Sequence, residues 1–227
     1  MNPFLNFLLF SIIVLSCKNK QQNGLVTIGE YFFRFPDDFT LVEEKGLDSY
    51  VGRIKGGNLQ LGFDYGFYSD PLVETPQEFL EIGFWKADAY TWFIKPKGSF
   101  TLERTQDVLL LGTKPIQTKA DSIQFNGADL IAICKLDKSV FNYGITFPDK
   151  TKEYEFLTDT INGHYRKIVV AKDPIKGITG IYLKDLRGFN KSVNASSALS
   201  MATSKLTKQQ QDSVISVFRN VKVTNEK

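Results

Sequence analysis

The side chains best suited to nucleophilic and metal chemistry are scarce in this sequence. His164 is the only histidine, and Cys17 and Cys134 are the only cysteines. Any Ser–His or Cys–His mechanism would have to run through His164. That histidine directly follows Asn162-Gly163, a pair that predicts a tight turn and a solvated His164 beside it. A zinc site built from histidines is excluded because the chain contains only one histidine. No metal or other cofactor is expected.

Compact catalytic motifs are missing from the sequence. It contains no G-x-S-x-G, H-E-x-x-H, Walker, G-x-G-x-x-G or C-x-x-C motif, which favours a non-enzymatic protein. One enzymatic alternative stays open because 25 acidic residues are present. Two carboxyl groups that face one cleft, about 5–10 Å apart, could hydrolyse a glycan.

The most suggestive acidic segment is 64–70, with the sequence DYGFYSD. Its two acids and two tyrosines around a glycine could line a pocket or hold Ca²⁺ through oxygen ligands. The segment lacks the regularly alternating acids of an EF-hand loop. We therefore predict a turn that ends a strand.

A cluster of large aromatic residues suggests a third function. Trp85, Tyr90 and Trp92 have flat faces that could stack on sugar rings, which would make the protein a carbohydrate- or small-ligand-binding module. Phe79, Phe84 and Phe93 lie nearby in the sequence, and burial in a core is the usual fate of such rings. Cys134, within the apolar run 130–134, is likewise expected to be a small buried hydrophobe.

The N-terminal segment is apolar and short. Residues 1–16 carry no charged side chain. Spanning a bilayer takes about 20 apolar residues, so this shorter run is typical of a signal peptide. It ends in Val14-Leu15-Ser16-Cys17, which resembles the lipobox of bacterial lipoproteins. The alternatives are a plain signal peptide and an uncleaved anchor.

The resemblance to lipoproteins implies a processed, lipid-anchored chain. Residues 1–16 would be removed, and the Cys17 thiol would be joined to a diacylglycerol. The new amine would then usually be acylated as well. Several acyl chains together would give a stable anchor, since one chain alone anchors only marginally. Residues 17–24 would form a flexible tether. Lys18 is not the aspartate that retains enterobacterial lipoproteins at the inner membrane, so the expected location is the outer membrane of a Gram-negative bacterium.

Short extended segments dominate the rest of the chain, and the pattern predicts strands over 26–35, 49–55, 58–64, 141–147, 154–161, 165–171 and 180–183. Gly56-Gly57 and Asn162-Gly163 predict two hairpins. A helix is predicted after Thr75-Pro76, and a second one follows the capping pattern that begins at Thr207. Residues 221–223 are expected to return as a short strand.

Two further segments resemble PsbP-like domains. Residues 31–39, YFFRFPDDF, are similar to the opening strand and proline turn of those domains, and residues 206–223 to their last helix and strand. The segments 46–52 and 63–66 resemble uncharacterised lipoproteins of Bacteroidota-type bacteria. These resemblances imply an antiparallel sheet with helices on its faces and a role in assembly or binding.

Composition agrees with one globular domain. The 227 residues are 42% hydrophobic with a net charge of +3, which excludes disordered, collagenous and multi-span membrane proteins. No run of five like charges occurs, so no nucleic-acid partner is expected. The sequence predicts a single α+β domain over 25–223, mainly an antiparallel sheet. We expect a non-enzymatic envelope lipoprotein whose partners are the bilayer, through acylated Cys17, and an envelope protein or glycan.

Overall fold

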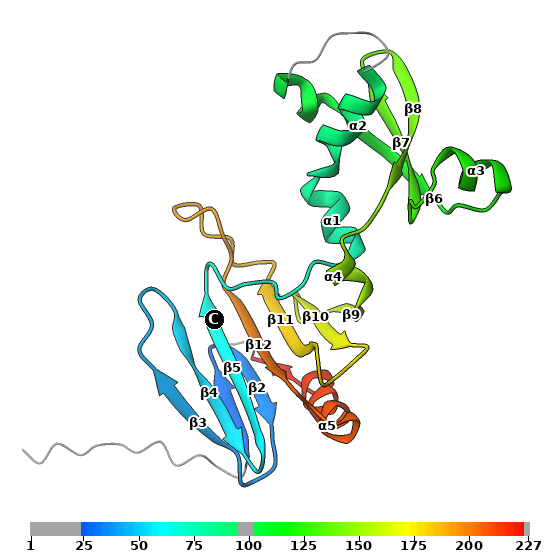
Figure 1. Ribbon diagram of the computed structural model, residues 1–227. Coiled ribbons are helices and arrows are strands. Elements are labelled where there is room, and N and C mark those ends of the chain that lie inside the picture. The colour runs from blue at the N-terminus through cyan, green and yellow to red at the C-terminus, as the bar shows by residue number, and fades with distance from the viewer. Residues whose placement is uncertain (1–23, 95–101, 225–227) are drawn as a thin grey trace, which may run out of the picture.

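The largest sheet of the computed structural model has seven strands in the order β3-β4-β5-β12-β11-β10-β9, and every neighbouring pair is antiparallel (Figure 1). Its strands are β3 (Thr40–Glu44), β4 (Tyr50–Gly56), β5 (Leu59–Gly66), β9 (Tyr154–Ile161), β10 (His164–Ala171), β11 (Ile178–Asp185) and β12 (Ala198–Ser204). The structure describes residues 24–94 and 102–224. The predicted signal peptide, Cys17 and tether residues 17–23 lie outside this range.

Both predicted hairpins are confirmed. β4 and β5 are joined through Gly57, whose φ is +52°. β9 and β10 are joined through Asn162 and Gly163, with φ values of +48° and +80°. A two-residue turn with both φ values positive matches the twist of the strands beside it, which explains the preference for Asn-Gly.

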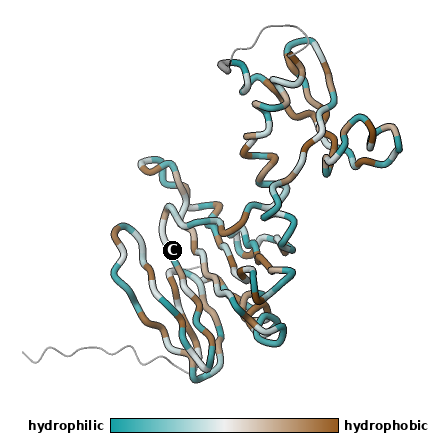
Figure 2. The backbone as a smooth tube through the Cα atoms, in the orientation of Figure 1, coloured by the Kyte–Doolittle hydropathy of each residue, from teal (hydrophilic) through white to brown (hydrophobic). Residues whose placement is uncertain are grey.

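A second layer covers one face of the large sheet. It consists of the small sheet β1 (Leu25–Ile28), β2 (Tyr31–Arg34) and β13 (Lys222–Val223), together with helix α5 (Lys208–Arg219). Thr207 and Gln210 form the predicted capping box of α5. Alternate residues of the strands enter the core between the layers, where Phe33 and Phe218 pack edge to face. Figure 2 shows the corresponding alternation of hydrophobic and hydrophilic positions along the strands.

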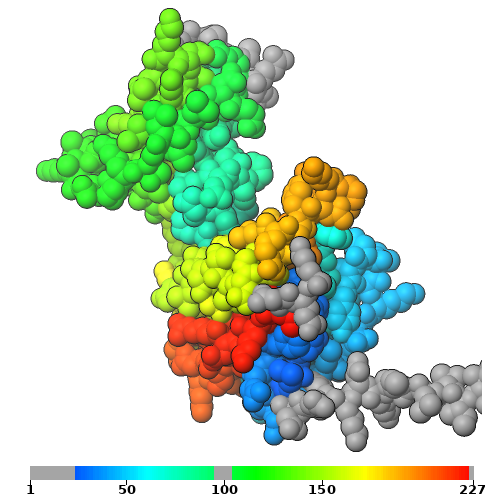
Figure 3. All heavy atoms as spheres, turned by 180° about the vertical axis from the view of Figure 1, so that it is seen from behind, coloured from blue at the N-terminus to red at the C-terminus, as the bar shows by residue number. Residues whose placement is uncertain are grey.

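Residues 76–94 and 102–152 form a smaller lobe with its own core (Figures 1 and 3). Its elements are α1 (Pro76–Ile82), α2 (Trp85–Ile94), the 3₁₀ helix η2 (Leu102–Asp107), β6 (Leu109–Lys114), α3 (Lys119–Gln124), β7 (Leu130–Leu136), β8 (Ser139–Ile145) and α4 (Asp149–Lys152). Strands β6, β7 and β8 form an antiparallel sheet against which α1 and α2 pack. The helix predicted after Thr75 is confirmed as α1, with a complete capping box.

The α+β prediction is confirmed: the domain is mainly antiparallel sheet with a few helices packed on it. The likeness to PsbP-like domains stays a prediction. Within the two described ranges, no helix is both long enough and apolar enough to cross a bilayer.

Candidate functional site

A cavity of about 850 Å³ lies where the two lobes meet. Strands β9, β10 and β11 supply one wall with the face that points away from the main core, and α1 with the segment before it supplies another. Besides α1, the small lobe contributes residues at the ends of β6 and β7 and in the segment after β8. Cavities of about 300–1,000 Å³ at the junction of two packed units are the usual place for a small-ligand site.

The cavity wall is rich in aromatic and aliphatic side chains. Those that line it are Leu80, Ile82, Leu130, Phe147, Phe156, Tyr165, Tyr182 and Leu186. Burial, together with the nearby carboxylate of Glu78, raises the pKa of Tyr182 to about 12, so its phenol is neutral at ordinary pH. A mostly apolar wall with a few hydroxyl groups suits a ligand with an apolar body.

A buried ion pair connects the lobes beside this cavity. The Lys167 ammonium on β10, fully buried, donates to both carboxylate oxygens of Glu78 on α1, at 2.8 and 2.9 Å. It also donates to the carbonyl of Val73 at 2.9 Å and lies 5.4 Å from the ring centre of Tyr182. Burial lowers the pKa of Lys167, and Glu78 opposes that shift. Glu78 also accepts from the backbone N–H of Thr75 at 2.7 Å.

The other charged groups at the cavity are Glu74, Glu81 and Lys184. Glu81 is exposed and accepts a hydrogen bond from Gln77 at 2.8 Å. The cavity therefore combines an apolar wall with charges of both signs. Because both carboxylate oxygens of Glu78 accept hydrogen bonds from Lys167, this side chain links α1 to β10.

A second cluster of polar groups surrounds His164 at one end of the main core. The prediction of a solvated His164 was wrong, because its exposed fraction is 0%. Residues 164, 166, 168 and 170 of β10 share the face that points toward the second layer. His164 is thereby placed under Tyr31 of β2, whose ring meets the imidazole edge to face at 5.3 Å.

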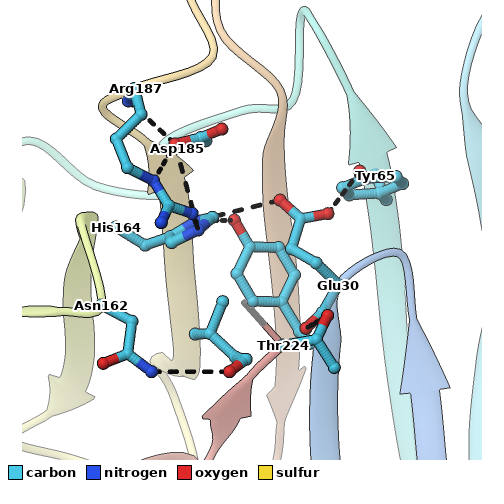
Figure 4. A network of polar contacts seen from close by, with 9 residues as sticks. Glu30, Tyr65, Asn162, His164, Asp185, Arg187 and Thr224 are labelled. Atoms are coloured by element: carbon cyan, nitrogen blue, oxygen red, sulfur yellow. Dashed lines mark hydrogen bonds and ion pairs between the residues drawn. The ribbon is translucent and has the colours of Figure 1, made fainter. Parts of the chain in front are cut away.

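Both ring nitrogens of His164 are in hydrogen bonds (Figure 4). Nη2 of Arg187 lies 2.6 Å from Nε2, and the Tyr31 hydroxyl lies 2.9 Å from Nδ1. A guanidinium can only donate, so Nε2 must be the unprotonated nitrogen. The imidazole is then neutral, with its proton on Nδ1 donated to the oxygen of Tyr31.

Two carboxylates flank the imidazole (Figure 4). Glu30, in the turn between β1 and β2, has an oxygen 3.8 Å from Nδ1 of His164 and accepts from the Tyr65 hydroxyl at 2.6 Å. Asp185, at the end of β11, has an oxygen 3.9 Å from Nε2 and accepts from the backbone N–H of Arg187 at 2.8 Å. The turn and the ends of three strands therefore meet at one polar cluster.

The pKa shifts in this cluster follow from burial and from these hydrogen bonds. Burial lowers the pKa of His164, which Asp185 counteracts. Burial would raise the pKa of Asp185, but hydrogen bonds from Arg187 bring it below its usual value. Burial and the hydrogen bond to Glu30 raise the pKa of Tyr65 to about 12. At neutral pH the cluster holds one guanidinium and two carboxylates around a neutral imidazole.

The acidic segment 64–70 comprises the last three residues of β5, 64–66, and the predicted turn that follows them. Asp64 and Asp70 have different surroundings. The Asp70 carboxylate accepts a hydrogen bond from the backbone N–H of Leu72 at 2.6 Å. Ser69 donates to the carbonyl groups of Asp64 and Ala198, each at 3.0 Å, and so closes the turn. One carboxylate oxygen of Asp64 is buried without a hydrogen-bond partner among the described residues.

The aromatic residues singled out in the sequence lie in the small lobe and do not line the cavity between the lobes. Trp85 and Tyr90 are buried, as predicted. Trp92 is 47% exposed and stacks on Phe141, so the expectation of a buried ring was wrong there. Cys134 is fully buried in the same core, which confirms its expected role.

Sequence reasoning missed the lysine–glutamate pair and the cavity. The available signal for Lys167 was its position directly before the apolar run 168–171 of the same strand, because a charge in a buried strand needs a buried partner. Nothing local indicated that its partner is Glu78, 89 positions away. Comparison with protein-family models and with curated proteins finds no match to this chain.

Proposed function

We propose that the protein is a membrane-anchored envelope lipoprotein, tethered through acylated Cys17, whose globular domain is a non-enzymatic binding module. The observation that carries the binding role is the cavity of about 850 Å³ between the lobes. The ligand class that fits its wall is a small molecule with an apolar body and a polar end.

The arrangement of charges favours binding over catalysis. Both carboxylate oxygens of Glu78 accept hydrogen bonds from Lys167, and Glu78 also caps its own helix. Its carboxylate is therefore not free to act as an acid or a base. Glycan hydrolysis would require two facing carboxyl groups that are free to exchange protons. That leaves Glu74 and Glu81 as the cavity carboxylates for the alternative function, a carboxylate-based hydrolase.

The tether rests on the lipobox that ends at Cys17. Several acyl chains would hold the domain at the outer membrane, since each buried CH₂ contributes about 0.8 kcal/mol. Metabolic labelling with palmitate tests this part of the proposal. We expect incorporation into the wild type and loss of it in Cys17→Ala, and equal incorporation into both would refute the lipid anchor.

Ligand binding is tested by titration calorimetry with decanoate, decylamine and chitotriose. Thr158 and Thr160 are exposed threonines on the same strand and the same face, but only Thr158 lines the cavity. Thr158→Trp should fill the cavity, and Thr160→Trp is its matched control.

We expect at least one decyl compound to bind the wild type and Thr160→Trp with one-to-one stoichiometry, and to bind Thr158→Trp at least tenfold more weakly. Binding that is equal in the two variants, or no binding by any probe, would contradict the cavity as the ligand site. Preference for chitotriose would favour a carbohydrate-binding module, and its cleavage would favour the hydrolase.

A further inference from the structure

The cluster around His164 has the composition of a metal site. Glu30, His164 and Asp185 each offer one ligand atom, and these atoms all lie within 4.8 Å of one another. Imidazole nitrogen and carboxylate oxygen are both common ligands of zinc and of similar divalent ions. His164 is fully buried, and the side chain of Asp185 is 11% exposed.

Two of the three groups already turn their lone pairs toward one cation. The guanidinium of Arg187 lies 2.6 Å from Nε2 of His164 and 3.3 Å from Oδ1 of Asp185. Both atoms are acceptors toward Arg187. A small cation at the place of that guanidinium would meet the same two lone pairs.

The charge balance favours a divalent ion at this place. Two carboxylates and one guanidinium leave the cluster with a net charge of −1, whereas a divalent ion in place of the guanidinium would neutralise it. Buried charges are stable only when they are compensated. The side chain of Arg187 is 43% exposed, so it can move into solvent without losing a buried position.

The surrounding hydrogen bonds are those that orient metal ligands. A ligating histidine normally donates its second ring N–H to a neighbour, and here Nδ1–H of His164 faces the Tyr31 oxygen at 2.9 Å. Tyr65 donates to Oε2 of Glu30 and so holds that carboxylate in place. Ligands held about 2.0–2.2 Å from zinc lie roughly 3.3–3.6 Å apart in a tetrahedral site. Oδ1 of Asp185 lies 3.9 Å from Nε2 of His164, whereas the 3.8 Å distance of Glu30 is to Nδ1. The three ligand atoms lie within 4.8 Å of one another, so the side chains must contract around the ion.

We propose that Glu30, His164 and Asp185 form a binding site for a divalent transition-metal ion of the zinc type, and that Arg187 is a built-in competitor that occupies the site when the ion is not bound. The inference is independent of the ligand cavity, because the cluster lies on the opposite face of the sheet. It revises the expectation that a single histidine excludes zinc, since two carboxylates can complete the ligand set.

The probe is Zn²⁺ alone, measured by competition with a chromophoric chelator on the full chain. A purification tag without histidine is used, and all samples carry Cys17→Ser to remove a second zinc-binding side chain. Arg187→Ala removes the competitor and should bind one Zn²⁺ at least tenfold more tightly than the Arg187 protein. Adding His164→Gln or Asp185→Asn to Arg187→Ala should weaken binding at least a hundredfold. Asp159→Asn, an acid paired with Arg166 outside the cluster, is the control and should change nothing.

Imidazole NMR gives a readout that does not depend on affinity. His164 is the only histidine, so a single set of ring ¹⁵N signals reports the site directly. We expect one ring nitrogen to shift on addition of Zn²⁺. Folded Arg187→Ala that binds no zinc would overturn the proposal. Zinc binding that leaves the His164 signals unchanged, or that survives His164→Gln and Asp185→Asn, would overturn it equally.

Discussion

Nη2 of Arg187 lies 2.6 Å from Nε2 of His164, and this contact determines the protonation of a buried imidazole. Because the guanidinium can only donate, the imidazole must be neutral for the bond to form. Protonation of His164 would place two cationic donors against each other. The bond therefore links the pH of the medium to the stability of the cluster.

We expect acid to destabilise the folded protein through His164. Its pKa is lowered below the usual 6.5, mainly by burial, so the unfolded chain takes up this proton at a higher pH than the folded protein. The stabilisation is fully present above 6.5 and is lost as the pH falls from there through the lowered pKa. Urea unfolding at a series of pH values, with a metal chelator present, measures the effect.

His164→Gln is the control for this titration, since glutamine cannot be protonated in this range. Its stability should change less than that of the wild type between pH 7 and pH 5. The same slope in both proteins would show that other groups cause the acid effect.

The Lys167–Glu78 pair should be a major contact between the lobes. Lys167→Met leaves the Glu78 carboxylate without its counter-ion, which costs about 3–5 kcal/mol in a buried pair. We expect the lower end of that range because the Glu78 side chain is 23% exposed. Urea denaturation measures the loss of unfolding free energy.

Two further variants test the cause. Lys167→Met with Glu78→Gln should recover part of the loss, because no uncompensated charge remains. Lys184→Met, on the same face of the neighbouring strand, should change stability by about 0.5 kcal/mol or less. A similar loss in Lys184→Met would contradict a specific role for the pair.

Cys134 should be unreactive in the folded protein. Burial raises the pKa of its thiol to about 11, and its exposed fraction is 0%. The thiolate is the reactive form, so a disulfide reagent at neutral pH should modify Cys134 only after the protein unfolds. Counting accessible thiols in Cys17→Ser, with and without denaturant, checks this. Rapid modification of the native protein would contradict the buried core of the small lobe.

The cap of α5 should contribute measurably to stability. Thr207→Ala removes the side-chain oxygen that accepts from Gln210 N–H at 3.2 Å, and the loss should be about 1 kcal/mol. Ser213→Ala, at an exposed position within the helix, is the matched control and should stay within about 0.5 kcal/mol of the wild type. Thermal unfolding followed by circular dichroism compares the two.

Local features of the fold were predictable because neighbouring residues produce them. Asn162-Gly163 forms a hairpin since both residues tolerate positive φ, and Thr207 starts a helix because its side chain reaches the amide three positions on. The apolar run around Cys134 indicated burial correctly. The same local reasoning failed for His164, because what covers the end of a hairpin is supplied by distant segments.

The sequence by itself determined the alternating strands, the hairpin turns and the helix caps, all of which depend on residues a few positions apart. Tertiary structure alone decided that residues 76–94 and 102–152 form a separate lobe and that β5 pairs with β12. It also brought Tyr31 to His164 across 133 positions. Such contacts depend on how whole faces of strands and helices pack. The hydrophobic effect is not directional, so a short apolar segment does not specify which distant segment it will pack against.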